Sequence, residues 1–197
     1  TDNPRVRHVL AEEWLHLGEL DRAEAELQAA DKLPKDTLKK EFFGETAWTV
    51  SRFRLGWDLA MRRGDAAQAA ARADETLALV TSQERMYRSL VLPYAVQAYA
   101  AVGRTADGRR YLGEYQDSLQ GQPTPAQARA IVVLKALLEA ADNRPYAIID
   151  VLQPAVKADP NNPQMLRLLA KAYEDTGQTA RTVETLEEYL HLNPQDE

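Results

Sequence analysis

Apolar residues recur at intervals of three and four positions in the segment 162–194, which is the spacing of amphipathic α-helices. The first half of the segment carries Leu166, Leu169, Ala170 and Tyr173, and the second half carries Val183, Leu186, Tyr189 and Leu190. Gly177 separates the halves, because glycine adopts the left-handed conformation that ends many helices. Pro194 follows where a helix can no longer continue. The pattern predicts a helix hairpin that needs neighbours to bury its apolar faces.

The N-terminal segment repeats this pattern closely enough to indicate an internal repeat. The places of Leu166, Leu169, Ala170 and Tyr173 are taken there by Arg7, Leu10, Ala11 and Trp14. Gly18 then matches Gly177 and Leu27 matches Leu186, while Pro34 falls one residue short of the position of Pro194. Three looser copies centre on Trp57 with Gly64, on Tyr99 with Gly103, and on Leu138 with a turn at 142–144.

This succession resembles the tetratricopeptide repeat, a helix pair of about 34 residues. The resemblance implies an all-α fold, a right-handed superhelical solenoid of antiparallel helix pairs. It places five pairs at 4–37, 45–80, 84–119, 125–158 and 163–194, within one solenoid spanning 1–197. Because the pattern is already under way at the first residues, we expect that the chain could also be a segment of a longer protein.

Several positions depart from a regular repeat. The intervals from Gly18 to Gly64 and from Gly64 to Gly103 exceed the family period, with the extra length at 33–45 and 81–88. The early helices are therefore expected to be longer or to be preceded by an extra turn. Pro93 and Pro154 fall inside helical patterns and are expected to kink them. The stretch GQPTP at 121–125 predicts a boundary, with Thr124 as N-cap and Pro125 as the first helical residue.

In this family the first helix of each pair lines the concave side and contacts the ligand. Transferred by position, the resemblance implies contact residues at Arg5, His8, Glu12, His16, Ser51, Arg54, Asp58, Arg62, Leu90, Gln97, Arg129, Val132, Gln164, Arg167, Lys171 and Glu174. The set is mixed in sign and rich in arginine, which favours a peptide with acidic or aromatic residues. A solvated charged face without a ligand is the alternative. The Lys and Asn pattern that holds chaperone tails is absent, so a cochaperone role is disfavoured.

Composition and charge narrow the function classes. The 197 residues are 45% hydrophobic and 27% charged, with a formal charge of −6, which disfavours nucleic acid as a partner. No apolar run approaches the roughly 20 residues of a membrane-spanning helix, so membrane insertion is not expected, and no signal peptide is recognisable. The absence of Cys excludes disulfides and thiolate sites but leaves the compartment open between bacterial cytoplasm and periplasm.

Catalytic and metal chemistry find no support in the sequence. His8, Glu12 and His16 share one helical stripe, but the two His lie about 12 Å apart along a helix axis and no fourth ligand is evident, so no metal site is predicted. Nucleophile-elbow, phosphate-loop and zinc-protease motifs are absent, and adjacent acids point in different directions on a helix. We therefore expect no enzyme and no cofactor. Trp14, Trp57 and Tyr173 are predicted core residues.

The last predicted helix suggests a second kind of contact. Solenoid ends need polar caps, and Val183, Leu186 and Leu190 would leave an apolar strip, so self-association into a homo-oligomer is expected if no further chain covers it. The main hypothesis is a scaffold or adaptor that binds a peptide or partner protein. Self-association and a domain that tightens on sensing a signalling peptide are the alternatives. The alanine content and the excess of Arg over Lys suggest a bacterial source, where such arrays serve in envelope assembly, secretion or polysaccharide export.

Overall fold

The computed structural model describes residues 3–34, 36–37, 44–81, 84–119 and 121–193. Throughout these ranges every regular element is an α-helix, which confirms the all-α prediction. The chain divides into two compact units, Thr1–Val102 and Gly103–Glu197, and each is described by itself. The boundary falls inside the predicted pair 84–119, so its two helices belong to different units.

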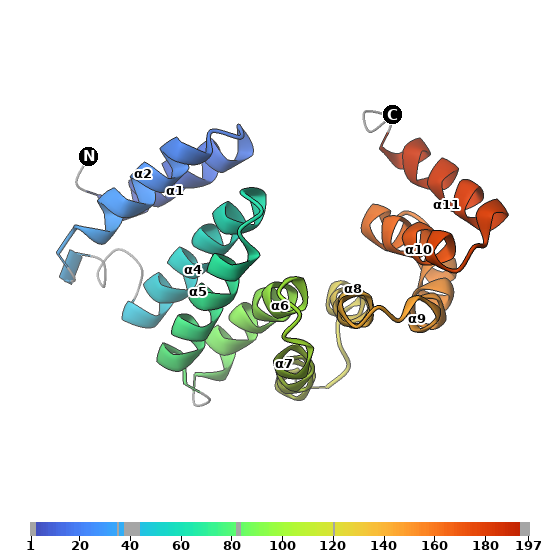
Figure 1. The fold of residues 1–197 in the computed structure, drawn as a ribbon. Coiled ribbons are helices and arrows are strands. Elements are labelled where there is room, and N and C mark those ends of the chain that lie inside the picture. The colour runs from blue at the N-terminus through green and yellow to red at the C-terminus, as the bar shows by residue number, and fades with distance from the viewer. Residues whose placement is uncertain (1–2, 35, 38–43, 82–83, 120, 194–197) are drawn as a thin grey trace. The chain divides into compact units, whose positions relative to one another are not determined.

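Among the described residues of unit 1, the labelled helices form two pairs and one further helix (Figure 1). The pairs are α1 (Pro4–His16) with α2 (Leu20–Asp31) and α4 (Glu45–Arg62) with α5 (Ala66–Leu79), followed by α6 (Arg85–Ala101). Each second helix also contacts the first helix of the next pair, α2 against α4 and α5 against α6. The first helices contact one another as well, α1 with α4 and α4 with α6, so one face of the unit is formed by α1, α4 and α6.

Unit 2 repeats this scheme. Its helices are α7 (Thr105–Ser118), α8 (Pro125–Ala141), α9 (Pro145–Ala158), α10 (Pro163–Asp175) and α11 (Thr179–Leu192). Within it α8 pairs with α9, α10 pairs with α11, and α9 also contacts α10. Consecutive pairs of this kind are consistent with a helical repeat. The handedness of a solenoid and its continuity over 1–197 stay predictions.

The turns between paired helices confirm the breaks expected from the sequence. At the end of α10, Gly177 has φ +72°, and the backbone N–H of Gln178 donates to the carbonyl of Tyr173 at 2.8 Å, which is the hydrogen bond of a Schellman cap. At the end of α8 the same role falls to Asn143, with φ +56°. Arg144 N–H donates there to Glu139 O at 3.0 Å. Asparagine tolerates the left-handed region better than other residues with a side chain, so this turn forms without glycine.

The helix starts follow side-chain capping. Thr124 accepts a hydrogen bond from Gln127 N–H while the Gln127 side chain accepts one from Thr124 N–H, a capping box that confirms Thr124 as N-cap and Pro125 as first residue of α8. Pro93 and Pro154 lie within α6 and α9. The expected kinks at these prolines stay predictions. Of the early helices α4 is long, with 18 residues, but α1 and α2 have only 13 and 12, so the early helices are not longer as a group. The chain at 38–43 and Pro194 lie outside the described residues.

Each unit has its own core. In unit 1, α1, α2 and α4 bury a cluster of Ala11, Leu15, Ala23, Leu27, Leu55 and Leu59. In unit 2, α8, α9 and α10 bury Val133, Ala136, Ile148, Ile149, Leu152, Met165, Leu169, Ala172 and Tyr173. Tyr173 is therefore a core residue, as predicted, whereas Trp14 and Trp57 are half-buried at the edge of the packing. Arg7 occupies the position that Leu166 occupies in the last repeat. Its charge is accommodated there because the guanidinium pairs with Glu26 of α2 at 2.9 Å.

Candidate binding groove on unit 1

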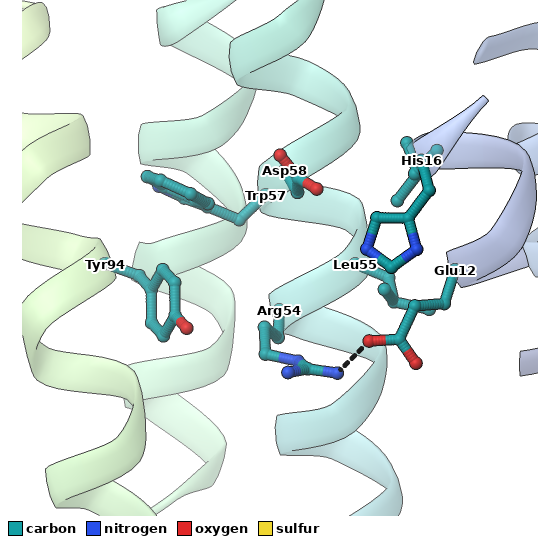
Figure 2. A pocket seen from close by; sticks show the side chains of 8 residues that line it. Glu12, His16, Arg54, Leu55, Trp57, Asp58 and Tyr94 are labelled. Atoms are coloured by element: carbon teal, nitrogen blue, oxygen red, sulfur yellow. Dashed lines mark hydrogen bonds and ion pairs between the residues drawn. The ribbon is translucent and has the colours of Figure 1, made fainter. Parts of the chain in front are cut away.

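The face formed by α1, α4 and α6 contains two adjacent hollows, which we call the polar hollow and the apolar hollow. The polar hollow has a volume of about 270 Å³ and is lined by Glu12, Leu15, His16, Arg54, Leu55, Trp57, Asp58 and Tyr94 (Figure 2). The apolar hollow has a volume of about 340 Å³ and is lined by Ala47, Val50, Ser51, Arg54, Tyr87, Leu90 and Tyr94. Arg54 and Tyr94 line both, so the two hollows together form one groove.

One ion pair and one hydrogen bond join α4 to α1 beside the polar hollow. The Arg54 guanidinium donates from Nη2 to Oε1 of Glu12 at 2.8 Å, a contact between α4 and α1 that Figure 2 marks. Arg62 pairs with Asp58 at 3.0 Å and also donates to the carbonyl of Leu15 at 3.1 Å. The side chains of both pairs are partly exposed, and such pairs contribute about 0–1 kcal/mol each. The Arg54–Glu12 pair can therefore open for a ligand at little cost.

Aromatic packing fixes the wall shared by the two hollows. The Tyr94 ring lies 4.8 Å from the Trp57 ring at an interplanar angle of 69° and 6.3 Å from the Phe53 ring at 84°. These edge-to-face contacts hold Tyr94 of α6 against α4. The indole Nε1 of Trp57 is buried and has no hydrogen-bond partner among the described residues. Tyr94 was not predicted as a site residue, although it lies four positions after Leu90 and thus on the same stripe of α6.

His8, one of the predicted contact residues, is buried. His8 is only 7% exposed and lines neither hollow. Its Nε2 shares a hydrogen bond with Oγ of Ser51 at 2.9 Å, and its ring centroid lies 6.3 Å from that of Trp48. Pro4, His8, Ala11 and Leu15 form the buried stripe of α1, so His8 faces α4 and joins the two helices.

Burial also lowers the pKa of His8, while Glu12 raises and Arg54 lowers it to smaller extents. The unfolded chain therefore takes up a proton at this residue at a higher pH than the folded chain does. We expect the free energy of unfolding to decrease as the pH falls below about 6.5, the ordinary histidine value. Urea titrations between pH 7.5 and 5.5 should show a smaller decrease for His8→Gln than for the unchanged protein. His16→Gln, at an exposed position of the same helix, should keep the full decrease; equal slopes for both variants would contradict the prediction.

The remaining predicted contacts do not all meet in this groove. Glu12, His16, Ser51, Arg54, Asp58 and Leu90 line it. Arg5 is exposed on α1, and the Gln97 side chain donates to Pro93 O at 3.4 Å on α6. In unit 2, Arg129 pairs with Asp159 at 3.5 Å, Lys171 pairs with Glu174 and Asp175 at 2.9 Å each, and Arg167 is exposed. Whether any of these bind a partner stays a prediction.

The described residues form neither a metal-binding cluster nor a membrane-spanning helix. Among these residues no group of three His, Asp or Glu side chains is arranged to hold a metal ion. None of the described helices combines the length and apolarity needed to cross a membrane.

No protein-family model matches the sequence, and no curated protein is significantly similar to it. Membership of the tetratricopeptide family therefore stays a prediction.

Proposed function

We propose that this protein is a scaffold or adaptor that binds a peptide segment of a partner protein in the groove of unit 1. The observation that supports the proposal best is that two hollows meet at Arg54 and Tyr94 on an exposed helical face. Leu90 at the edge of the apolar hollow is 54% exposed, and an exposed apolar side chain beside polar groups is typical of binding sites. The groove crosses three helices, which suits an extended segment better than a compact small molecule.

The charge of the groove agrees with a protein partner. Glu12 of α1 pairs with Arg54 of α4, and Asp58 pairs with Arg62 one turn away on α4, so no single-sign surface suited to phosphates is formed. The resemblance to bacterial tetratricopeptide arrays suggests envelope assembly, secretion or polysaccharide export as the process served. This assignment of a process rests on the resemblance alone.

Site-specific photocrosslinking tests the proposed binding. A crosslinking amino acid at position 90 should trap a discrete protein from a lysate of the source organism, because this position borders the apolar hollow. The matched control carries the crosslinker at position 71, an exposed residue of α5 that does not line the groove. The trapped protein should disappear when Tyr94→Ala is added. The same products from positions 90 and 71, or none from either, would contradict the proposal.

A second candidate function is self-association through α11. Val183 and Leu186 are exposed and Leu190 is half-buried, so the apolar strip expected on this helix is present within the described residues. An exposed strip of this kind favours contact with a second copy of the chain.

Light scattering over a range of protein concentrations tests this second function. The mass of the unchanged protein should rise with concentration, and Leu186→Glu combined with Leu190→Glu should abolish the rise, because carboxylates do not enter an apolar contact unpaired. Leu79→Glu, at an exposed position of α5, is the control and should behave like the unchanged protein. If the mass of the unchanged protein, of the double variant and of Leu79→Glu were all independent of concentration, self-association would be excluded.

A further inference from the structure

We propose that the groove selects segments in which an apolar or aromatic side chain stands next to an internal Asp or Glu. The apolar side chain enters the apolar hollow, and the carboxylate binds the guanidinium of Arg54. This inference rests on the proposed function, since it specifies the segment that the groove of unit 1 takes.

The lining of the apolar hollow sets the first requirement. Ala47, Val50 and Leu90 present aliphatic surface there, and Tyr87 and Tyr94 present aromatic surface. Its volume of about 340 Å³ lies within the range of about 300–1,000 Å³ that is usual for ligand pockets. Arg54 is the charged member of the lining, so a cationic side chain placed in the hollow would be repelled. An uncharged apolar or aromatic side chain is the occupant that fits.

Arg54 sets the second requirement. A guanidinium has five N–H donors, and the described contacts of Arg54 use Nη2 toward Glu12. Nε and Nη1 make no hydrogen bond to the described residues, and the side chain is half-exposed between the two hollows. The planar fork matches a carboxylate and binds it with two hydrogen bonds. A segment lying in the apolar hollow can thus place a carboxylate at Arg54, where it would accept hydrogen bonds from the unused N–H groups of the guanidinium.

The polar hollow indicates that this carboxylate belongs to a side chain. It continues the groove beyond Arg54, where Glu12 and Asp58 contribute two carboxylates. A segment ending at Arg54 with its C-terminal carboxylate would leave this hollow empty. A segment that runs through carries its acidic side chain at Arg54 and places a further residue, uncharged or cationic, beside Glu12 and Asp58. A segment that fills both hollows therefore meets Arg54 with an internal Asp or Glu rather than with a terminal carboxylate.

Glu12 competes with such a ligand, because it already occupies one edge of the Arg54 guanidinium at 2.8 Å. Replacement of Glu12 by Gln removes the competing charge and leaves Arg54 in place. Binding of an acidic segment should then become several-fold tighter. If Glu12 only contributed to stability, removing its charge would not increase the affinity for the segment.

The experiment begins with a library of random peptides displayed through their C-termini, so that no peptide has a free terminal carboxylate. Selection on the unchanged protein should enrich an apolar or aromatic residue with Asp or Glu close by. Selection on Leu90→Glu, which places a charge at the apolar hollow, should not enrich these peptides. No enrichment on the unchanged protein relative to Leu90→Glu would overturn both the proposed function and the inference.

A synthetic form of the enriched peptide with an amidated C-terminus then tests the inference separately from the proposed function. Measured by fluorescence anisotropy, it should bind Arg54→Gln about tenfold more weakly than the unchanged protein. Replacing the Asp or Glu of the peptide by Asn or Gln should weaken binding to the unchanged protein by the same factor. The same replacement should not change binding to Arg54→Gln. Arg85→Gln, which removes an exposed charge of α6 outside both hollows, should bind it normally. Enriched peptides without an acid, or an acid that matters equally to Arg54→Gln, would overturn the inference and leave the proposed function standing.

Discussion

Replacing Leu59 by Ala is expected to lower the free energy of unfolding of unit 1 by about 3 kcal/mol. Leu59 is 1% exposed and belongs to the core cluster shared by α1, α2 and α4. The substitution removes three buried carbon atoms of α4 from the cluster that it shares with α1 and α2, and the surrounding side chains can fill the space only in part. Binding in the groove should weaken as well, since the same packing holds α1 against α4.

Tryptophan fluorescence during urea unfolding measures this effect selectively. Trp14, Trp48 and Trp57, the three tryptophans of the chain, all lie in unit 1. Leu79→Ala is the matched control, because it makes the same chemical change at a side chain of α5 that is 67% exposed. It should change the free energy of unfolding by less than about 0.5 kcal/mol. A similar decrease in the free energy of unfolding for Leu59→Ala and Leu79→Ala would contradict the expectation that the burial of Leu59 causes the larger effect.

Replacing Ala136 by Leu is expected to lower the free energy of unfolding of unit 2 by about 2 kcal/mol. Ala136 of α8 is fully buried in the cluster formed with α9 and α10. The small side chain lets these helices approach closely, and three added carbons must force them apart or push neighbouring side chains out of their preferred rotamers. Far-ultraviolet circular dichroism during urea unfolding measures the change.

Ala140→Leu provides the control on the same helix. Ala140 lies one turn after Ala136 but is exposed, and Ala and Leu have similar helix propensities. This variant should therefore unfold at nearly the same urea concentration as the unchanged protein. If Ala136→Leu were as stable as Ala140→Leu, the packing between α8 and its neighbours would be looser than described.

Most of the helices and their ends were predictable from the sequence, because they depend on residues close together in the chain. The stripe through Leu166, Leu169 and Tyr173 and the break at Gly177 follow from helical spacing and from backbone conformation. The capping box at Thr124 is likewise a local signal, formed by residues three positions apart. Local signals of this kind determined the all-α class and the helix pairs.

The tertiary structure decided which faces of these helices meet. His8, Glu12 and His16 form one stripe by spacing, yet His8 is buried against Ser51, Glu12 pairs with Arg54, and His16 remains exposed. Spacing along one helix does not specify how far the next helix covers the edge of a stripe. The apolar hollow is a further case, since it combines Val50 of α4 with Tyr87 and Leu90 of α6.

The sequence by itself thus determined the helices and the turns between them, because each depends on neighbours a few residues away. The groove, the Arg54–Glu12 pair and the place of Tyr94 between the two hollows required the packing of α1, α4 and α6. These contacts join residues some forty positions apart. Only the fit of side chains between helices determines whether such residues meet.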